Sequence, residues 1–275
     1  MDLRELMDGI SCLSIRSALI ALRNPSKLRQ YVSHCLRSSD EFLGHGLPPG
    51  SPVSPAEDMT VTIPAHHSGG GMAFDELVYL ARAVKVLKPT TIFEMGTYNG
   101  LATAVFILNS EPTARILTLD LPPGTSETAA LSSDGSLVAS RQLLSTTKAL
   151  GLSRYTQLLC DSMQFDPTPY AGTVDMGLID AAHDLVHVQN DTMKMTQMMT
   201  PGGIVFWHDY GGKGMLRPLA SYLENLAKKR PLYHILGTTL AWGRASDLKV
   251  AIGLETIPEM STQTHWGSSR SISSP

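Results

Sequence analysis

The sequence predicts an α/β fold, a Rossmann-like, doubly wound and mostly parallel seven-stranded sheet with helices on both faces. Three observations support this prediction. Strand-like and helix-like segments alternate from residue 74 to 254, a glycine-containing turn joins the first strand to a helix, and successive strands end in an acidic residue. Alternating β and α segments predict parallel strands joined by right-handed crossovers. The 275 residues suffice for one such domain with extensions.

The first strand, over 91–94, leads through Gly96 and Gly100 into a helix expected over 101–109. Glycine lets the backbone approach a ligand closely, and the first turn of a helix offers N–H groups without helical partners. The spacing Glu94-x-Gly96-x-x-x-Gly100 is not the Gly-x-Gly-x-x-Gly with which a dinucleotide fold binds a pyrophosphate. An acid here repels a phosphate and suits a ligand with an amino-acid ammonium group. S-adenosylmethionine is such a ligand.

The other elements follow from apolar spacing and from turn residues. A helix is expected over 74–87, where Lys88-Pro89 ends it. Further strands are expected at 114–120, 154–160, 174–180, 203–209, 232–236 and within 240–254. Helices are expected between them at about 137–150, 185–199 and 216–229. Pro201-Gly202-Gly203 is expected to turn the chain into the fifth strand.

Acidic residues stand at the ends of the first five expected strands: Glu94, Asp120, Asp161, Asp180 and Asp209. In an open parallel sheet, ligands bind outside the carboxyl ends of the strands. Five acids there disfavour a phosphate and favour hydroxyls, amines, a sulfonium or a metal ion. Acids also cap helices, so a structural role for one or two of them stays open.

Composition narrows the class of partner. The net charge of −3 gives no general attraction to nucleic acid or anionic lipid. Three widely spaced cysteines favour a reduced, cytoplasmic location, and no apolar run reaches the ~18 residues of a membrane span. We therefore expect a small-molecule partner, with no nucleic acid and no membrane span. The apolar segment over 3–22 would suit a homodimer contact, although packing on its own domain is favoured.

Four motifs make residues 72–254 similar to class I S-adenosylmethionine-dependent methyltransferases. The likeness is greatest to the small-molecule and sugar O-methyltransferase branch. The motifs are EMGTYNG at 94–100, IDAAH at 179–183, PGG at 201–203 and WHDY at 207–210. The resemblance implies S-adenosylmethionine as cofactor and a small hydroxylated acceptor, such as a sugar or natural product. It divides the chain into a helical extension (1–45), a Pro/Gly-rich loop or lid (46–72), the cofactor-binding methyltransferase domain (73–254) and a disordered tail (255–275).

The resemblance also implies which residues bind the cofactor. Residues at the methionine end would include Glu94, Gly96 and Gly100; Asp120 would bind both ribose hydroxyls, and Asp161 the adenine amino group. The full expected set is Glu94, Gly96, Thr97, Asn99, Gly100, Asp120, Asp161, Ser162 and Asp180. Two of these residues keep a structural alternative. Asp120 can be a turn residue, and Asp161 with Ser162 an ordinary helix cap.

His183 is the candidate general base, with Asp180 and Asp209 beside it, because methyl transfer to a hydroxyl needs a base or a metal ion. In some sugar O-methyltransferases of this branch, the acids matching Asp180 and residues 208–209 hold magnesium. His208 stands where those enzymes carry glutamate, and magnesium prefers oxygen ligands. Mg²⁺ at Asp180, His208 and Asp209 is therefore an open expectation. His208 can instead bind the acceptor or orient Asp209.

Plainer alternatives remain. His183 can be a residue that caps the following helix, and His208 a buried histidine paired to backbone. The whole chain can be a non-catalytic protein that binds S-adenosylmethionine. An NAD-dependent oxidoreductase is disfavoured by the missing third glycine of the dinucleotide pattern.

Overall fold

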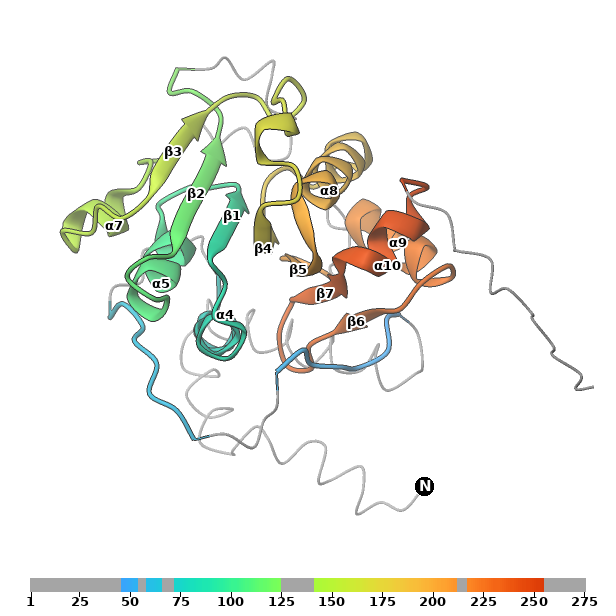
Figure 1. The fold of residues 1–275 in the computed structure, drawn as a ribbon, viewed down its shortest axis with the longest axis horizontal. Helices are drawn as coiled ribbons and strands as arrows, with labels where there is room; N and C mark the ends of the chain where they lie inside the picture. Colours follow the sequence, from blue (N-terminus) through green and yellow to red (C-terminus); the bar gives the residue numbers. More distant parts are fainter. Residues whose placement is uncertain (1–45, 54–57, 66–71, 125–140, 212–216, 255–275) are drawn as a thin grey trace, which may run out of the picture.

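The structure is a computed structural model that describes residues 46–53, 58–65, 72–124, 141–211 and 217–254. The helices expected in 1–45 and the disordered tail expected in 255–275 lie outside these ranges. The described part contains one twisted sheet with helices on both faces (Figure 1). None of its helices has the length and hydrophobicity that crossing a bilayer requires.

The sheet has seven strands in the order β3-β2-β1-β4-β5-β7-β6. They are β1 (Thr91–Met95), β2 (Arg115–Asp120), β3 (Thr156–Leu159), β4 (Val174–Ile179), β5 (Met199–Trp207), β6 (Leu232–His234) and β7 (Ala241–Arg244). The first five run parallel, and β7 is antiparallel to both neighbours. Met95 is level with Leu119 and Ile179, and Ile179 with Trp207. The loops after β1, β2, β4 and β5 therefore leave the sheet at one edge.

Helices cover both faces of the sheet, as the predicted fold class requires. They are α4 (Phe74–Leu87), α5 (Leu101–Asn109), α7 (Ser145–Ala149), α8 (Leu185–Met198), α9 (Arg217–Ala227) and α10 (Ala245–Ala251), with a 3₁₀ turn at Thr168–Tyr170. One core joins α4 and α5 to Ile92 of β1, and the other joins α8, α9 and α10 to Phe93. Adjacent residues of β1 thus enter opposite cores, because side chains alternate along a strand. The predicted doubly wound, mostly parallel sheet is confirmed.

Two of the predicted elements, a helix and the last strand, are wrong in extent. In the described part of the helix expected at 137–150, only α7 is helical, because Leu144 before it has a left-handed backbone with φ of 59°. The strand expected within 240–254 ends at Arg244, and α10 follows. In α10, Ala245, Leu248 and Ala251 are buried at three-residue steps, which is a helical spacing.

Smaller differences concern strand ends. Pro201-Gly202-Gly203 lies within β5 rather than forming a turn, and an irregularity in the pairing of β4 with β5 beside it accommodates the segment. β1 extends one residue past Glu94. Of the acids expected at strand ends, Glu94 therefore lies within its strand and Asp120 is the last residue of its strand. Asp180 lies one residue past its strand, and Asp161 and Asp209 lie two residues past theirs.

Gly96 is the point where the loop after β1 meets the end of β4. Its φ is +93°, and a Cβ atom there would lie 1.9 Å from the carbonyl oxygen of Asp180. Both the backbone conformation and the space therefore require glycine.

We expect Gly96→Ala to lower the free energy of unfolding by more than about 2 kcal/mol, measured by urea unfolding. A left-handed non-glycine residue costs about 1–2 kcal/mol, and the clash with backbone adds to this. Gly151→Ala is the control, because its φ is +66° but no atom lies within 4 Å of the added Cβ. An equal loss in the two variants would show that the contact with Asp180 does not matter.

Candidate active site

Asp120, the last residue of β2, shapes the loop that follows β1. Its Oδ2 accepts hydrogen bonds from the backbone N–H groups of Thr97 (3.1 Å) and Tyr98 (2.9 Å), and its Oδ1 from that of Leu121 (2.7 Å). The Nε of Arg141 lies 3.5 Å from Oδ1. Asp120 is therefore more than a turn residue, because it fixes the glycine loop. Binding of ribose hydroxyls by Asp120 stays a prediction.

Other residues of the loop hold its shape from within. The hydroxyl of Thr97 is hydrogen-bonded to that of Thr118, and Asn99 Oδ1 accepts from the N–H of Leu101 at 3.1 Å. Gly100 has a φ of +77°, and a Cβ there would lie 2.4 Å from Thr147 Oγ1. The loop thus reaches the N-terminus of α5 in one defined conformation, which suits a rigid ligand cradle.

Glu94 lies inside the protein, on the face of the sheet that α5 covers. Its side chain is buried, and Thr103 of α5 donates a hydrogen bond to Oε2. Burial, together with the nearby charges of Asp180 and Asp120, raises the pKa of Glu94 to about 8, although hydrogen bonds with Thr103 and Thr118 oppose this rise. At neutral pH Glu94 is therefore a neutral acid within the core. Its expected place at the methionine end of a cofactor stays a prediction.

Asp161 and Ser162 form a turn after β3. Asp161 Oδ1 accepts from the backbone N–H of Met163 at 2.9 Å, which stabilises the turn. The alternative of a helix cap is wrong, because no helix begins at this turn. The carbonyl oxygen of Ser162 accepts from Asn190 Nδ2 (3.0 Å) and Lys194 Nζ (2.6 Å), both on α8. The turn is thus anchored to α8, and adenine binding by this pair stays a prediction.

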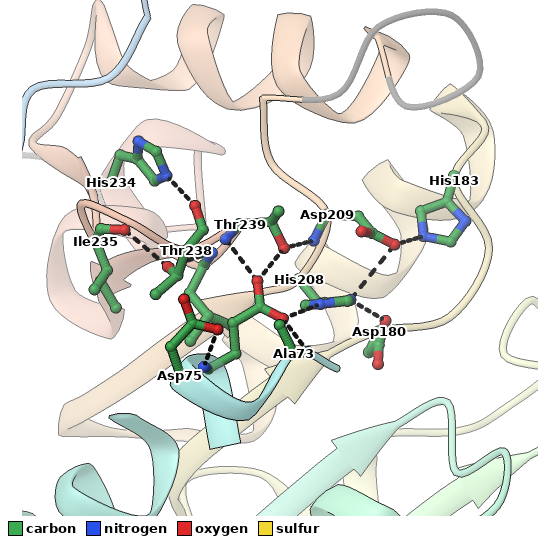
Figure 2. A network of polar contacts seen from close by, with 12 residues as sticks. Ala73, Asp75, Asp180, His183, His208, Asp209, His234, Ile235, Thr238 and Thr239 are labelled. Atoms are coloured by element: carbon green, nitrogen blue, oxygen red, sulfur yellow. Dashed lines mark hydrogen bonds and ion pairs between the residues drawn. The ribbon is translucent and has the colours of Figure 1, made fainter. Parts of the chain in front are cut away.

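Four predicted catalytic or metal-binding residues come together where β4 and β5 end (Figure 2). His183 Nε2 lies 3.1 Å from Asp209 Oδ2, and His208 Nδ1 lies 2.9 Å from Asp180 Oδ1. His208 Nδ1 is also 3.4 Å from Asp209 Oδ2. The two histidines therefore share one carboxylate oxygen. Their proximity was expected, because the ends of parallel strands meet at one edge.

Glu76 of α4, which the sequence did not reveal, completes this network. Its Oε2 accepts from His208 Nε2 at 3.0 Å and from the N–H of Ala73 at 2.8 Å. Its Oε1 accepts from the N–H and the hydroxyl of Thr239, at 2.6 and 2.7 Å. An acid in the first turn of a helix is usually read as a cap. Only its burial, with 3% exposed, and its distant partners reveal this second role.

His208 carries a positive charge in this arrangement. Both ring nitrogens face carboxylate oxygens, which only accept hydrogen bonds, so both nitrogens must be protonated. Burial opposes the charge, but Asp180 and Asp209 raise the pKa of His208 well above its ordinary value. Although burial opposes ionisation of Glu76 too, the hydrogen bond from His208 and the charge of His208 lower its pKa to about 2.

The structure also decides between the plainer alternatives for the two histidines. The N-cap of α8 is Asp184, whose Oδ1 accepts from the N–H groups of Val186 and His187, so His183 is not the cap. The ring of His208 contacts carboxylates rather than backbone. Burial opposes ionisation of Asp209, but the charge of His208 and a hydrogen bond from His183 hold its pKa well below the usual range.

A family profile described as a methyltransferase domain matches residues 93–210. The chain carries a methyltransferase domain. This match, together with the fold, confirms the resemblance to class I S-adenosylmethionine-dependent methyltransferases. Glu76 and Thr239 lie outside the matched range.

Solved structures of other proteins are similar to this chain at low sequence identity. Cofactor-bound Rv0187 from MTB is 15% identical, with a TM-score of 0.50 over 65% of this chain and 83% of that chain. The methyltransferase PaMTH1 of Podospora anserina, bound to SAH, is 15% identical, with a TM-score of 0.46 over 61% and 76%. The O-methyltransferase TomG of Streptomyces achromogenes, in complex with SAM, is 15% identical, with a TM-score of 0.44 over 62% and 79%. A search of curated protein sequences found no significant match.

The three residues expected to bind magnesium, Asp180, His208 and Asp209, are not arranged as magnesium ligands in the structure. His208 has both nitrogens bonded to carboxylates and bears a positive charge, so it cannot be a ligand. Among the described residues, Asp180, His183 and Asp209 offer ligand atoms within 4.8 Å of one another. This set includes one histidine and adjoins a cation, whereas magnesium prefers oxygen ligands. The site therefore does not favour Mg²⁺.

A pocket of about 580 Å³ opens beside the network of the methyltransferase domain. It lies between residues 49–53, α4 and the turn between β6 and β7, with Ser51 and Tyr79 on its walls. Asp75 and Thr238, which also line it, directly adjoin Glu76 and Thr239 in the sequence. Residues 49–53 of the loop expected over 46–72 thus line one pocket together with the first turn of α4 and the turn before β7.

The neutral Glu94 makes the stability of the methyltransferase domain depend on pH. Folding raises its pKa from 4.5 to about 8, so the unfolded chain releases this proton at lower pH than the folded chain. The contribution to the free energy of unfolding is therefore fully present below pH 4.5, falls as the pH rises to about 8 and is constant above that.

We expect Glu94→Gln to remove this fall, which amounts to several kcal/mol, because glutamine cannot lose the proton. Urea unfolding near pH 5 and near pH 8.5 should show a wild type that weakens more with rising pH than the variant does. Glu111→Gln, at an exposed acid, is the control and should follow the wild type. Parallel pH profiles of wild type and Glu94→Gln would contradict a raised pKa.

Proposed function

We propose that the chain is an S-adenosylmethionine-dependent O-methyltransferase that acts on a small hydroxylated acceptor, such as a sugar or natural product. The observation that carries this proposal is the pair of His183 and Asp209 at the carboxyl edge of the sheet, 3.1 Å apart. Beside them lies the glycine loop that Asp120 holds in place. A base and a cofactor cradle at one edge are what methyl transfer to a hydroxyl requires.

Charge supports S-adenosylmethionine as the cofactor. Glu76, Asp180 and Asp209 lie together with one imidazolium, that of His208, so the network is negative overall. Such a potential attracts a ligand with a sulfonium and an ammonium group and repels phosphates. The glycine spacing at 96–100 also lacks the third glycine that NAD binding needs.

The proposed chemistry needs only a proton acceptor, because S-adenosylmethionine supplies an already electrophilic methyl group when bound. His183 donates a hydrogen bond from its Nε2–H group to Asp209, so the lone pair of the neutral ring lies on Nδ1. Nδ1 would then accept the proton of the acceptor hydroxyl, while the methyl group passes from the sulfur of the cofactor to the hydroxyl oxygen and S-adenosylhomocysteine leaves. Asp209 fixes the tautomer of His183 and stabilises the imidazolium that forms.

The pocket beside Thr238 is the place we propose for part of the acceptor, because it adjoins the network and has hydroxyl groups in its walls. A cytoplasmic location and a possible homodimer remain predictions. A non-catalytic S-adenosylmethionine-binding protein is the alternative that the following experiments address.

Thermal unfolding with S-adenosylmethionine, S-adenosylhomocysteine and NAD tests the cofactor. A ligand at about 100 times its Kd stabilises by about 2.7 kcal/mol, or several degrees for a chain of this size. We expect this shift with both adenosyl ligands, with or without a chelator, and none with NAD. Absence of a shift with either adenosyl ligand would contradict the proposal, as would a shift with NAD alone.

Replacing His183 tests the base. We expect His183→Ala to lower the rate of methyl transfer by ~10²-fold or more while leaving cofactor binding unchanged. The assay follows labelled methyl transfer from S-adenosylmethionine to a panel of sugars and phenols. His187→Ala is a matched control, because His187 also contacts an aspartate, Asp184, outside the network. Unchanged turnover in His183→Ala would end its assignment as base.

A further inference from the structure

We infer that Glu76 is a positioning residue that holds His208 as a built-in cation against Asp180 and Asp209, so that the site needs no divalent metal ion. The inference rests on the proposed function, because it assigns how the same site is charged. It adds residues that lie outside the matched methyltransferase domain.

Every oxygen of Glu76 is committed within the protein. Each of the two accepts two hydrogen bonds, from Ala73 and His208 on one side and twice from Thr239 on the other. A buried carboxylate with four donors keeps its charge and has one orientation. A simple helix cap would need only the contact with Ala73.

Thr239 links Glu76 to the catalytic pair by a second route. Its hydroxyl donates to Glu76 Oε1 and accepts from the backbone N–H of Asp209 at 3.2 Å. Asp209 has a left-handed backbone with φ of 63°, a conformation that non-glycine residues adopt only when neighbours hold them. The first turn of α4 and the turn before β7 thus fix both residues that follow β5.

His208 is thus held where its positive charge lies close to the carboxylates of both Asp180 and Asp209. Its Nδ1 lies 2.9 Å from Asp180 Oδ1 and 3.4 Å from Asp209 Oδ2. Asp209 Oδ2 also receives His183 Nε2. A metal ion ligated by this oxygen would have to displace two N–H donors and would face the positive charge of His208. The fixed imidazolium supplies the charge that a metal would otherwise bring.

Titration of the full chain with Mn²⁺, followed by the electron paramagnetic resonance signal of free Mn²⁺, tests the inference without an acceptor. We expect no binding by the wild type at neutral pH. The double variant Glu76→Gln/His208→Glu removes the cation and adds an oxygen ligand between Asp180 and Asp209. The double variant should bind Mn²⁺, with an affinity at least about tenfold above the detection limit that applies to the wild type. Asp75→Asn, at the exposed neighbouring acid, should behave like the wild type.

The ring nitrogens of His208, observed by NMR at neutral pH, report on the positioning role itself. In the wild type both should be protonated. In Glu76→Gln the proton on Nε2 or Nδ1 should be lost, whereas Asp75→Asn should keep both. Thr239→Val removes one hydrogen bond to Glu76, so a smaller fraction of His208 should carry protons on both ring nitrogens. This variant supplies a second test if Glu76→Gln does not fold.

Two results would overturn the inference. One is Mn²⁺ binding by the wild type as tight as by the double variant; the other is a singly protonated His208 in the wild type. S-adenosylmethionine binding is measured on the same samples. If the wild type does not bind S-adenosylmethionine, the proposed function is refuted. The metal and NMR results then decide the inference separately.

Discussion

The imidazolium of His208 is the interaction on which the candidate active site depends. It lies between carboxylates on opposite sides of its ring, Glu76 at Nε2 and Asp180 at Nδ1. Removing one member of a buried, paired set leaves the other charges without compensation, which is more costly than never having had them. The position of Asp209, and through it that of His183, follows from this central charge.

The acids in and around this edge of the sheet differ in their protonation states. Glu94 is neutral because it lies inside the α5 face with only hydroxyl partners, whereas Glu76 is ionised because a cation adjoins it. Asp120 serves a third purpose, since backbone N–H groups of the glycine loop bind its carboxylate. Acidic residues that look alike in the sequence thus acquire separate roles from their surroundings.

Local patterns predicted much of this fold and part of the site. The helices expected at 74–87 and 101–109 have these bounds in the structure, because apolar spacing and adjacent turn residues determine them. The meeting of Asp180, His183, His208 and Asp209 followed from parallel strands that end at one edge. Glu76 could not be predicted, because its partner His208 is 132 residues away and an acid in a first helical turn has an ordinary explanation. The helix expected at 137–150 failed since apolar spacing does not reveal the left-handed backbone of Leu144.

The bond between Thr239 and Glu76 joins residues 163 positions apart, so it bears on how the protein is made as well as on how it works. During synthesis the glycine loop and the ends of β4 and β5 leave the ribosome before the turn that carries Thr239. Contacts of such long sequence separation form late, because closing a long loop costs entropy before any contact repays it. A nascent chain that stops short of this turn contains the glycine loop but leaves Glu76 without half of its hydrogen bonds. Catalytic competence would therefore be acquired at the end of folding, when β6 and β7 dock.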